Sequence, residues 1–225
     1  MSERLLRPIR SFVRREGRLT DGQQRALDTL YPLHGVDWQG GVLALDELFD
    51  RAAPLVLDIG FGDGEALATM APAHPERNYM GVEVYRAGTG QLLRHIEHEG
   101  IDNLKVMLAD AAELLREGIP SGSLAGLQLF FPDPWPKKRH HKRRMVQPAW
   151  LSLVADRLKP GGFLHMATDW EEYAQWMLEL TEAEPLFENT HGGFAPDAGD
   201  RPQTRFERRG LRKGHGVFDL MLQRI

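Results

Sequence analysis

The sequence predicts an α/β fold with a doubly wound, mostly parallel sheet. Two observations support this prediction: short apolar runs alternate with segments of helical periodicity between residues 55 and 183, and an acidic residue stands at or just after the end of each run. This alternation is typical of βαβ units, in which helices cover both faces of a parallel sheet. The length of 225 residues suits one principal domain with short appendages.

Each element follows from its local pattern. Residues 55–60 are apolar and run into a glycine-rich turn, which predicts the first strand, and the apolar spacing over 65–73 predicts the helix after it. The same pair of patterns then repeats along the chain. We expect strands over residues 79–84, 104–108, 127–131 and 163–168, and helices over 91–98, 111–117, 148–158 and 171–183. Residues 204–208 and 216–223 are expected to form a final strand pair, and residues 189–202 are loop-like in composition.

Charge is unevenly distributed along the chain. Residues 1–25 hold seven Arg and three acids, a net charge of +4, and residues 137–144 hold six Lys or Arg and no acid. Because the whole chain carries −4, the remainder carries −14. A third basic run, residues 201–213, has six basic residues and one acid. The three basic runs predict a nucleic-acid partner, and the acidic remainder predicts a cationic ligand.

Composition excludes several classes of protein. Without cysteine the chain has no disulfide, no thiolate zinc site and no cysteine nucleophile. No stretch approaches the ~20 consecutive apolar residues of a membrane span, and residues 1–10 lack the apolar core of a signal peptide. We therefore expect a cytoplasmic protein that does not act in a membrane.

Acidic residues mark the expected binding edge of the sheet, because ligands of open parallel sheets bind at the carboxyl ends of the strands. A single acid in such a place is ordinarily a helix cap, which remains an alternative for Asp110. Five acids at one edge favour a ligand site instead. They are Asp58, Glu83, Asp110, Asp133 and Asp169.

The turn after the first strand has the glycines of a nucleotide-type cofactor site, which let the backbone turn tightly and approach a ligand. These candidate cofactor-binding glycines are Gly60, Gly62 and Gly64. A dinucleotide fingerprint would require glycine or alanine where the chain has Glu65, and a pyrophosphate would meet the carboxylates of Asp58 and Asp63.

S-adenosylmethionine suits this turn better, because its sulfonium and ammonium groups are attracted to carboxylates. Glu83 lies 25 residues after Asp58, near the spacing of ~20 at which an acid binds ribose hydroxyls. The alternative for Glu83 is an acid at a strand end that faces water.

Six stretches of the sequence carry a resemblance to a known family. They are RSFVRREGRLTDGQQRALD, DIGFGDG, GVEVYRAG, LFFPDPWPKKRHHKRR, HMATDWEEYA and TRFERRGLRKGHGVFDLM, which span nearly the whole chain. With them the chain resembles the class I S-adenosylmethionine-dependent methyltransferases, which have a Rossmann-like sheet, and specifically the bacterial tRNA (guanine-N7)-methyltransferases of the TrmB type. FFPDPWPKKRHHKRR is the most specific of these stretches, whereas DIGFGDG alone indicates only a methyltransferase.

The resemblance implies an enzyme that methylates N7 of a guanine in tRNA, the guanine at position 46 of the variable loop. It implies cofactor contacts at Asp58, Glu83, Asp110 and Asp133, the last of which also lies in the catalytic pocket. Substrate contacts are implied at Lys137, Asp169, Thr204, Arg205, Phe206 and Glu207. The family more often has Glu where this chain has the shorter Asp58. Residues 1–35 would form a basic N-terminal arm and lead-in, and residues 36–225 the methyltransferase domain.

The reaction itself restricts what the catalytic residue can do. Guanine N7 has a free lone pair at neutral pH, so the methyl group can be transferred without a general base. Asp133 lies between Pro132 and Pro134, whose fixed φ angles would hold its carboxylate rigidly to stabilise the positive charge developing on the purine. Trp135 either stacks on the base or packs under the loop.

The basic run after Asp133 is predicted to bind RNA phosphates. Its RNA-contacting candidates are Lys138, Arg139, His140, His141, Lys142, Arg143 and Arg144. We read His140 and His141 as part of this polar surface and expect no metal requirement. Two alternatives remain open from the sequence: a methyltransferase for another RNA site or a small molecule, and an RNA-binding module with a vestigial cofactor pocket.

Overall fold

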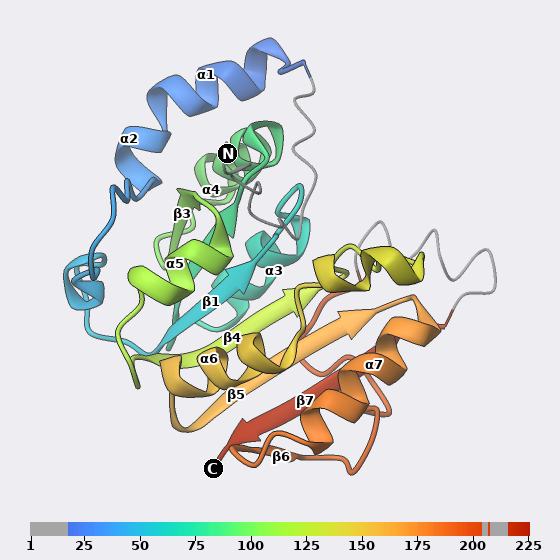
Figure 1. Cartoon of the computed structure of the whole chain (residues 1–225). Helices are drawn as coiled ribbons and strands as arrows, with labels where there is room; N and C mark the ends of the chain where they lie inside the picture. The colour runs from blue at the N-terminus through green and yellow to red at the C-terminus, as the bar shows by residue number, and fades with distance from the viewer. Residues whose placement is uncertain (1–17, 204–206, 208–215) are drawn as a thin grey trace, which may run out of the picture.

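The computed structural model describes residues 18–203, 207 and 216–225, and shows a seven-stranded sheet flanked by helices (Figure 1). The strand order is β3-β2-β1-β4-β5-β7-β6. The first five strands in the chain are parallel, whereas β7 is antiparallel to both β5 and β6. In Figure 1 the arrowheads of β1, β4 and β5 accordingly point to one side, and that of β7 points the opposite way. The predicted doubly wound, mostly parallel α/β fold is confirmed.

The elements have the following bounds. The strands are β1 Leu55–Ile59, β2 Asn78–Glu83, β3 Leu104–Leu108, β4 Leu124–Phe130, β5 Leu158–Thr168, β6 Phe187–Asn189 and β7 Phe218–Arg224. The helices are α1 Asp21–Thr29, α2 Tyr31–His34, α3 Glu65–Ala73, α4 Arg86–Glu99, α5 Ala111–Glu117, α6 Pro148–Arg157 and α7 Glu171–Glu182. Two short 3₁₀ helices are η1 Leu45–Glu47 and η2 Lys138–Arg143.

Alternate residues of β1 belong to different cores, because successive side chains of a strand point to opposite faces. Leu55 and Leu57 pack in the core under α5, α6 and α7. Val56 packs in the core under α3, α4 and α1. The two layers of helices are visible on either side of the sheet in Figure 1. All five residues of β1 are buried, as expected for a strand in the middle of a doubly covered parallel sheet.

The bounds of α3, β3 and α5 are those predicted from the sequence. Helix α4 begins five residues earlier than predicted, because its first turns contain Gly88 and Gly90, which resemble helix breakers. The lack of side chains is needed for packing: a Cβ at Gly88 would lie 1.9 Å from the carbonyl oxygen of Gly62, and one at Gly90 2.8 Å from that of Gln23. Strand β5 also begins early, where Leu158 pairs with Leu124.

The strand expected over residues 216–223 is confirmed as β7, but the partner expected for it is wrong. Strand β7 pairs with β5 and with the short β6, which the sequence analysis missed. Within residues 204–208, the expected partner, Glu207 is the one described residue and is helical, while the other four lie outside the described residues.

Helix α1 was not predicted either, although its start has a recognisable signal. Thr20 and Gln23 form a capping box, in which each side chain accepts a hydrogen bond from the other residue's backbone N–H. Ala26 and Leu27 are buried, and α1 packs against α4. Residues 1–17 of the expected basic arm lie outside the described residues. Across the part that the structure describes, no helix is long and apolar enough to cross a bilayer.

Candidate active site

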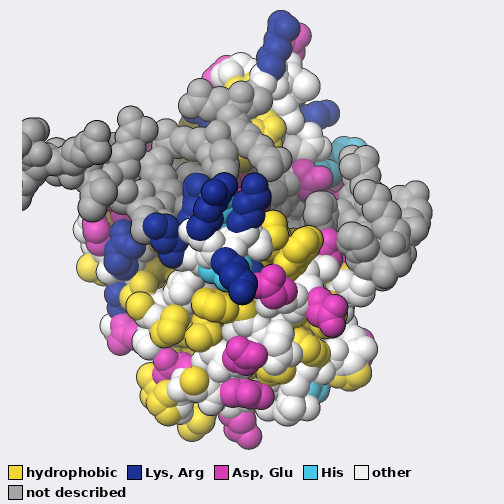
Figure 2. Space-filling model, turned by 45° about the vertical axis from the view of Figure 1, so that its right-hand side comes forward, with side chains coloured by type: hydrophobic (Ala, Val, Ile, Leu, Met, Phe, Trp, Pro, Cys, Tyr) yellow, Lys and Arg dark blue, Asp and Glu magenta, His cyan; other side chains and the backbone are white. Residues whose placement is uncertain are grey.

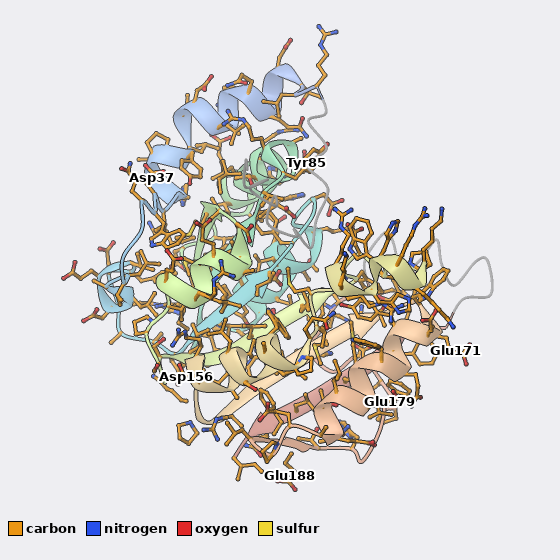
Figure 3. All side chains as sticks on the ribbon, in the orientation of Figure 1. Asp37, Tyr85, Asp156, Glu171, Glu179 and Glu188 are labelled. Atoms are coloured by element: carbon orange, nitrogen blue, oxygen red, sulfur yellow. The ribbon has the colours of Figure 1, made fainter. Side chains whose placement is uncertain are left out.

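The carboxyl edge of the parallel strands brings together the acids singled out in the sequence. Asp58 is within β1, Glu83 ends β2, and Asp110, Asp133 and Asp169 follow β3, β4 and β5. The edge is the one toward which the arrowheads of β1, β4 and β5 point in Figure 1. In Figure 3, Tyr85 after β2 and Glu171 after β5 are labelled near this edge, whereas Asp156 is labelled on the opposite side of the sheet.

The glycine turn after β1 presents open backbone at this edge. Gly60, Gly62 and Gly64 all have positive φ, at 74°, 62° and 78°. An added Cβ at Gly60 or Gly62 would meet nothing within 4 Å, so a ligand can approach the backbone there. A Cβ at Gly64 would instead lie 2.6 Å from Leu92 of α4. The first two glycines therefore provide access for a ligand, and the third allows helix packing.

Asp58 is a buried carboxyl beside this turn, with only 3% of its surface exposed. Burial and the neighbouring charge of Glu83 both raise its pKa, to about 7. The ionised form of Asp58 is therefore unfavourable in free energy, and a positive charge placed nearby would offset that free energy.

Glu83 ties the second strand to the glycine turn. Its carboxylate accepts hydrogen bonds from the backbone N–H groups of Gly62 at 3.1 Å, Val84 at 2.6 Å and Tyr85 at 3.1 Å. Burial raises the pKa of Glu83, the three hydrogen bonds lower it, and the charge of Asp133 adds to the net rise. Glu83 does not simply face water, and it lies within the electrostatic range of the proposed catalytic carboxylate.

Asp110 is a helix cap, as the alternative interpretation of this residue allowed. Its side chain accepts a hydrogen bond from the N–H of Ala112 at 3.0 Å, at the start of α5. The cap uses Oδ1, and the residue stands at the same edge as Asp58 and Glu83.

The loop after β4 holds Asp133 between two strained positions. Phe131 and Trp135 have φ angles of 51° and 46°, in the left-handed region that bulky residues rarely adopt. Asp133 is exposed between them, and the N–H of Phe131 is bonded to the carbonyl of Ala167 at 2.7 Å. The loop thus has an unusual path that leaves Asp133 exposed at the sheet edge, within electrostatic range of Glu83.

The basic run forms η2 directly after this loop, and Figure 2 shows Lys and Arg side chains gathered on one face of the molecule. Lys137, Lys138, Arg139 and Lys142 are exposed. The guanidinium of Arg143 lies over the Trp135 ring, 3.8 Å from its centroid, and the His140 ring meets the same indole edge-on at 5.9 Å. Partial burial, then the neighbouring cations, lower the pKa of His140.

Arg144 departs from the expected RNA surface, and that prediction is corrected. Its side chain is fully buried, with Nε donating to the carbonyl of Pro134 at 2.9 Å and a terminal nitrogen donating to Glu172 at 3.1 Å. The guanidinium lies 5.0 Å from the ring of Tyr173 and 5.2 Å from that of Trp176. Arg144 therefore supports the Asp133 loop through its hydrogen bond to the carbonyl of Pro134.

Several other predicted residues are placed by the structure as follows. His141 is largely buried, and its Nε2 lies 3.4 Å from Glu172. Asp169 is half-buried at the start of the turn into α7. Glu207 is buried against Arg201. Arg201 begins the third basic run, residues 201–213, which was expected to face a nucleic acid; because its side chain is buried, that prediction is wrong for Arg201. Thr204, Arg205 and Phe206 lie outside the described residues. The described ranges contain no group of three His, Cys, Asp or Glu arranged to hold a metal ion.

Comparisons with known proteins agree on one class of enzyme. The family described as "Putative methyltransferase" matches residues 52–220. A protein of Alkalilimnicola ehrlichii named tRNA (guanine-N(7)-)-methyltransferase is 62% identical over 218 residues, which cover 95% of this chain and 92% of that protein. A protein of the same name from Halorhodospira halophila is 63% identical, with 96% of this chain and 94% of that protein covered.

Solved structures share the fold at low sequence identity. The 16S rRNA methyltransferase KamB superposes with a TM-score of 0.59 at 18% identity, covering 80% of this chain and 91% of that one. A SAM-dependent methyltransferase from Aquifex aeolicus has a TM-score of 0.52 at 13% identity, covering 80% and 87%. These two likenesses concern the fold alone.

The raised pKa of Asp58 predicts that the free protein loses stability as pH rises. Because the folded-state pKa is about 7 and the unfolded value is near 3.8, the folded state binds the extra proton between these values. The free energy of unfolding should fall from about pH 4 to about pH 8, by up to roughly 4 kcal/mol from this group. Urea unfolding of Asp58→Asn and wild type at pH 5 and pH 8 measures it. The variant should be more stable relative to wild type at pH 8 than at pH 5. An equal difference in the free energy of unfolding at both pH values would contradict the assignment.

Arg144→Met should lower the free energy of unfolding by about 1 to 3 kcal/mol, because the carbonyl of Pro134 loses its buried donor. Lys142→Met, two residues away and exposed, is the matched control and should change it by less than about 0.5 kcal/mol. Denaturant unfolding of both variants gives the comparison. Equal losses of stability in the two variants would contradict a buried, stabilising role for Arg144.

Proposed function

Because the chain belongs to the tRNA (guanine-N(7)-)-methyltransferase family, we propose that it transfers a methyl group from S-adenosyl-L-methionine to N7 of guanine 46 in the variable loop of tRNA. The observation that carries this proposal is the juxtaposition at one sheet edge of a carboxylate-lined glycine turn and an exposed carboxylate, Asp133, followed directly by a basic surface. We expect the enzyme to act in the cytoplasm on this substrate.

The glycine turn fits a cofactor that is cationic and has no phosphate. Asp58 and Glu83 have raised pKa values, and a sulfonium or ammonium group nearby would favour their ionised forms. Glu83 would receive the ribose hydroxyls, and Gly60 and Gly62 would allow the cofactor to approach the backbone. Asp110 would contact the cofactor through Oδ2, the carboxylate oxygen that does not take part in the helix cap. When bound, S-adenosylmethionine supplies the methyl group on a sulfonium that needs no further activation.

Asp133 would stabilise the charge that moves to the purine during transfer. The guanine N7 lone pair attacks the methyl carbon in line with the breaking bond, and no proton leaves in this step. The carboxylate of Asp133 would stabilise the growing positive charge without having to move. Its loop has strained φ angles on either side, at Phe131 and Trp135. Lys137, Asp169 and residues 204–207 would contact the substrate nucleotide.

The exposed cations after Asp133 would guide tRNA phosphates to this edge. Lys137, Lys138, Arg139 and Lys142 are exposed on or beside η2, and His140 and Arg143 extend the same surface. His141, also expected to contact RNA, is largely buried against Glu172 and does not belong to it. We assign the Arg-rich N-terminal arm, within the expected arm and lead-in of residues 1–35, to the same partner. Phosphate contacts would position the tRNA, and the pocket would select the base.

The proposed activity is tested by incubating unmodified tRNA with methyl-labelled S-adenosylmethionine and digesting the product to nucleosides. The label should appear as N7-methylguanosine, and chain cleavage at the modified base should map it to position 46. A tRNA carrying adenine at position 46 is the control and should take up no label. Label in another nucleoside, or in the control, would refute the assignment of the site, and no label in wild-type tRNA would refute the function.

Asp133→Asn should lower the single-turnover rate by about 10² or more, because it keeps the loop geometry but removes the charge. The dissociation constants of cofactor and tRNA should change much less. Asp102→Asn, an exposed acid before β3 at the opposite edge, is the matched control.

The wild-type rate at saturating cofactor should also be nearly flat from about pH 6.5 to 8.5, since no proton transfer is required and bound cofactor keeps Asp58 ionised. A steep rise through neutrality that disappears in Asp133→Asn would show that Asp133 acts as a base.

Neutralising Lys138, Arg139 and Lys142 together to Gln should weaken tRNA binding and flatten its salt dependence. Three fewer phosphate contacts would lower the slope of log K against log salt by roughly 2 to 3. The control neutralises Arg116 and Lys159, exposed cations at the opposite edge of the sheet. Binding titrations at several salt concentrations measure both slopes. A slope equal to that of wild type would mean that the loop does not bind tRNA.

A further inference from the structure

A second buried guanidinium, that of Arg201, lies near the same edge and has no part in the proposed chemistry. Its side chain is wholly inaccessible to solvent. It binds Asp219 of β7 through two hydrogen bonds of 2.9 Å each, from Nε and from a terminal nitrogen. It binds Glu207 through both terminal nitrogens, at 2.5 Å and 3.3 Å. One cation thus joins two buried carboxylates in a paired, fork-like geometry.

Asp219 is the fixed side of this arrangement. It pairs with Ala167 across the β5–β7 ladder, and its Oδ1 lies 2.8 Å from Nε2 of His165 on β5. Although burial alone would raise it, hydrogen bonds from His165 and Arg201 hold the pKa of Asp219 below its usual range. Asp219 therefore remains ionised and anchors Arg201 to the sheet.

Arg201 also faces the end of β4. Its guanidinium carbon lies 5.2 Å from the ring centroid of Phe131 and 5.7 Å from that of Phe130. Phe131 has the strained φ of 51° from which the chain turns into the Asp133 loop. The same side chain therefore contacts Glu207 on one side and the bend before the catalytic loop on the other.

Stability alone does not account for this network. Buried ion pairs are often no more stabilising than apolar residues of the same volume, because the charges lose their hydration. They do fix the relative position of the groups they join, since both partners must keep the geometry of the fork. The groups joined here are Glu207, from the segment assigned to the substrate, and the fixed frame of β5 and β7.

We propose that Arg201 is a positioning residue for methyl transfer: it holds Glu207, one of the residues assigned to the substrate, in a fixed position relative to the bend at Phe131 that leads to Asp133. This inference rests on the proposed function. Arg201 itself contacts neither cofactor nor substrate in this scheme, and its effect passes through Glu207 and Phe131. The glycine turn follows β1, and no described contact of Arg201 reaches it, so cofactor binding should not depend on this residue.

The test is Arg201→Lys, which keeps the charge and loses the fork. The single-turnover rate with saturating tRNA and cofactor should fall by at least about tenfold, the size of effect expected from a small misplacement of reacting groups. The dissociation constant of S-adenosylmethionine, measured by calorimetry, should stay within about twofold of wild type. A role in folding alone would not separate these two quantities.

Arg157→Lys is the matched control. Arg157 is also largely buried and binds backbone carbonyls, those of Leu115 and Arg116, together with the side chain of Asp156. It precedes β5 at the opposite edge, where Asp156 is labelled in Figure 3. This variant should lose stability but keep its rate within about twofold of wild type.

If Arg201→Lys does not fold, Asp219→Asn tests the same link, since the amide loosens the grip on Arg201 while leaving Glu207 paired. Its rate should fall with unchanged cofactor affinity. A folded variant at either position with a wild-type rate, or an equal loss in Arg157→Lys, would overturn the positioning role. Failure of the proposed function would instead show as absence of transfer by the wild-type protein.

Discussion

Negative charge held at the carboxyl edge of the sheet is the constraint on which the rest of the site depends. Asp58 is buried where its pKa rises to about 7, and Glu83 is raised as well, with Asp133 adding to the effect. Carboxyl groups with pKa values raised by burial and by neighbouring like charges are concentrated at functional sites, where a ligand can offset their free-energy cost. In the proposed function a cationic cofactor would do so by binding, which agrees with the carboxylates that lie beside the glycine turn.

The cationic side chains near the site fall into two groups, one exposed and one buried, with different roles. The exposed cations of η2 remain hydrated and can exchange water and counterions for phosphates. The guanidiniums of Arg144 and Arg201 are buried, and each lies between an aromatic face and a carboxylate. These two contact the chain just before and just after Asp133, at Phe131 and at Pro134. The loop that carries Asp133 is therefore contacted by two buried cations, whereas the cations that follow it on η2 are exposed.

The sequence predicted what depends on local pattern and missed what depends on packing between distant segments. Helices α3 and α5 were placed correctly because their apolar spacing and their boundary residues agree. The start of α4 was missed because Gly88 resembles a helix breaker in the sequence. Only the structure shows that the carbonyl of Gly62 packs against it and leaves no room for a Cβ. Likewise Arg144 resembles its neighbours in a basic run, and nothing local shows that Tyr173 and Trp176 enclose it. The acids at the strand ends could be predicted, since topology alone brings them to one edge; the pKa of Asp58 could not, because burial decides it.

A reaction that needs no proton transfer changes what the protein has to supply. Where a base is required, catalysis depends on a pKa matched to the working pH. In the proposed reaction the nucleophile is already free and the methyl group already activated, so the rate would depend on the alignment of the reactants and on the fixed carboxylate of Asp133. The structure agrees with that demand: strained φ angles at Phe131 and Trp135, a buried donor to the carbonyl of Pro134, and Arg201 against Phe131 all restrict the path of the chain around Asp133. In the proposed mechanism Arg144 and Arg201 therefore support the reaction by holding the chain around Asp133 and not by contacting the substrate, and their burial and hydrogen bonds distinguish them from the exposed cations of η2.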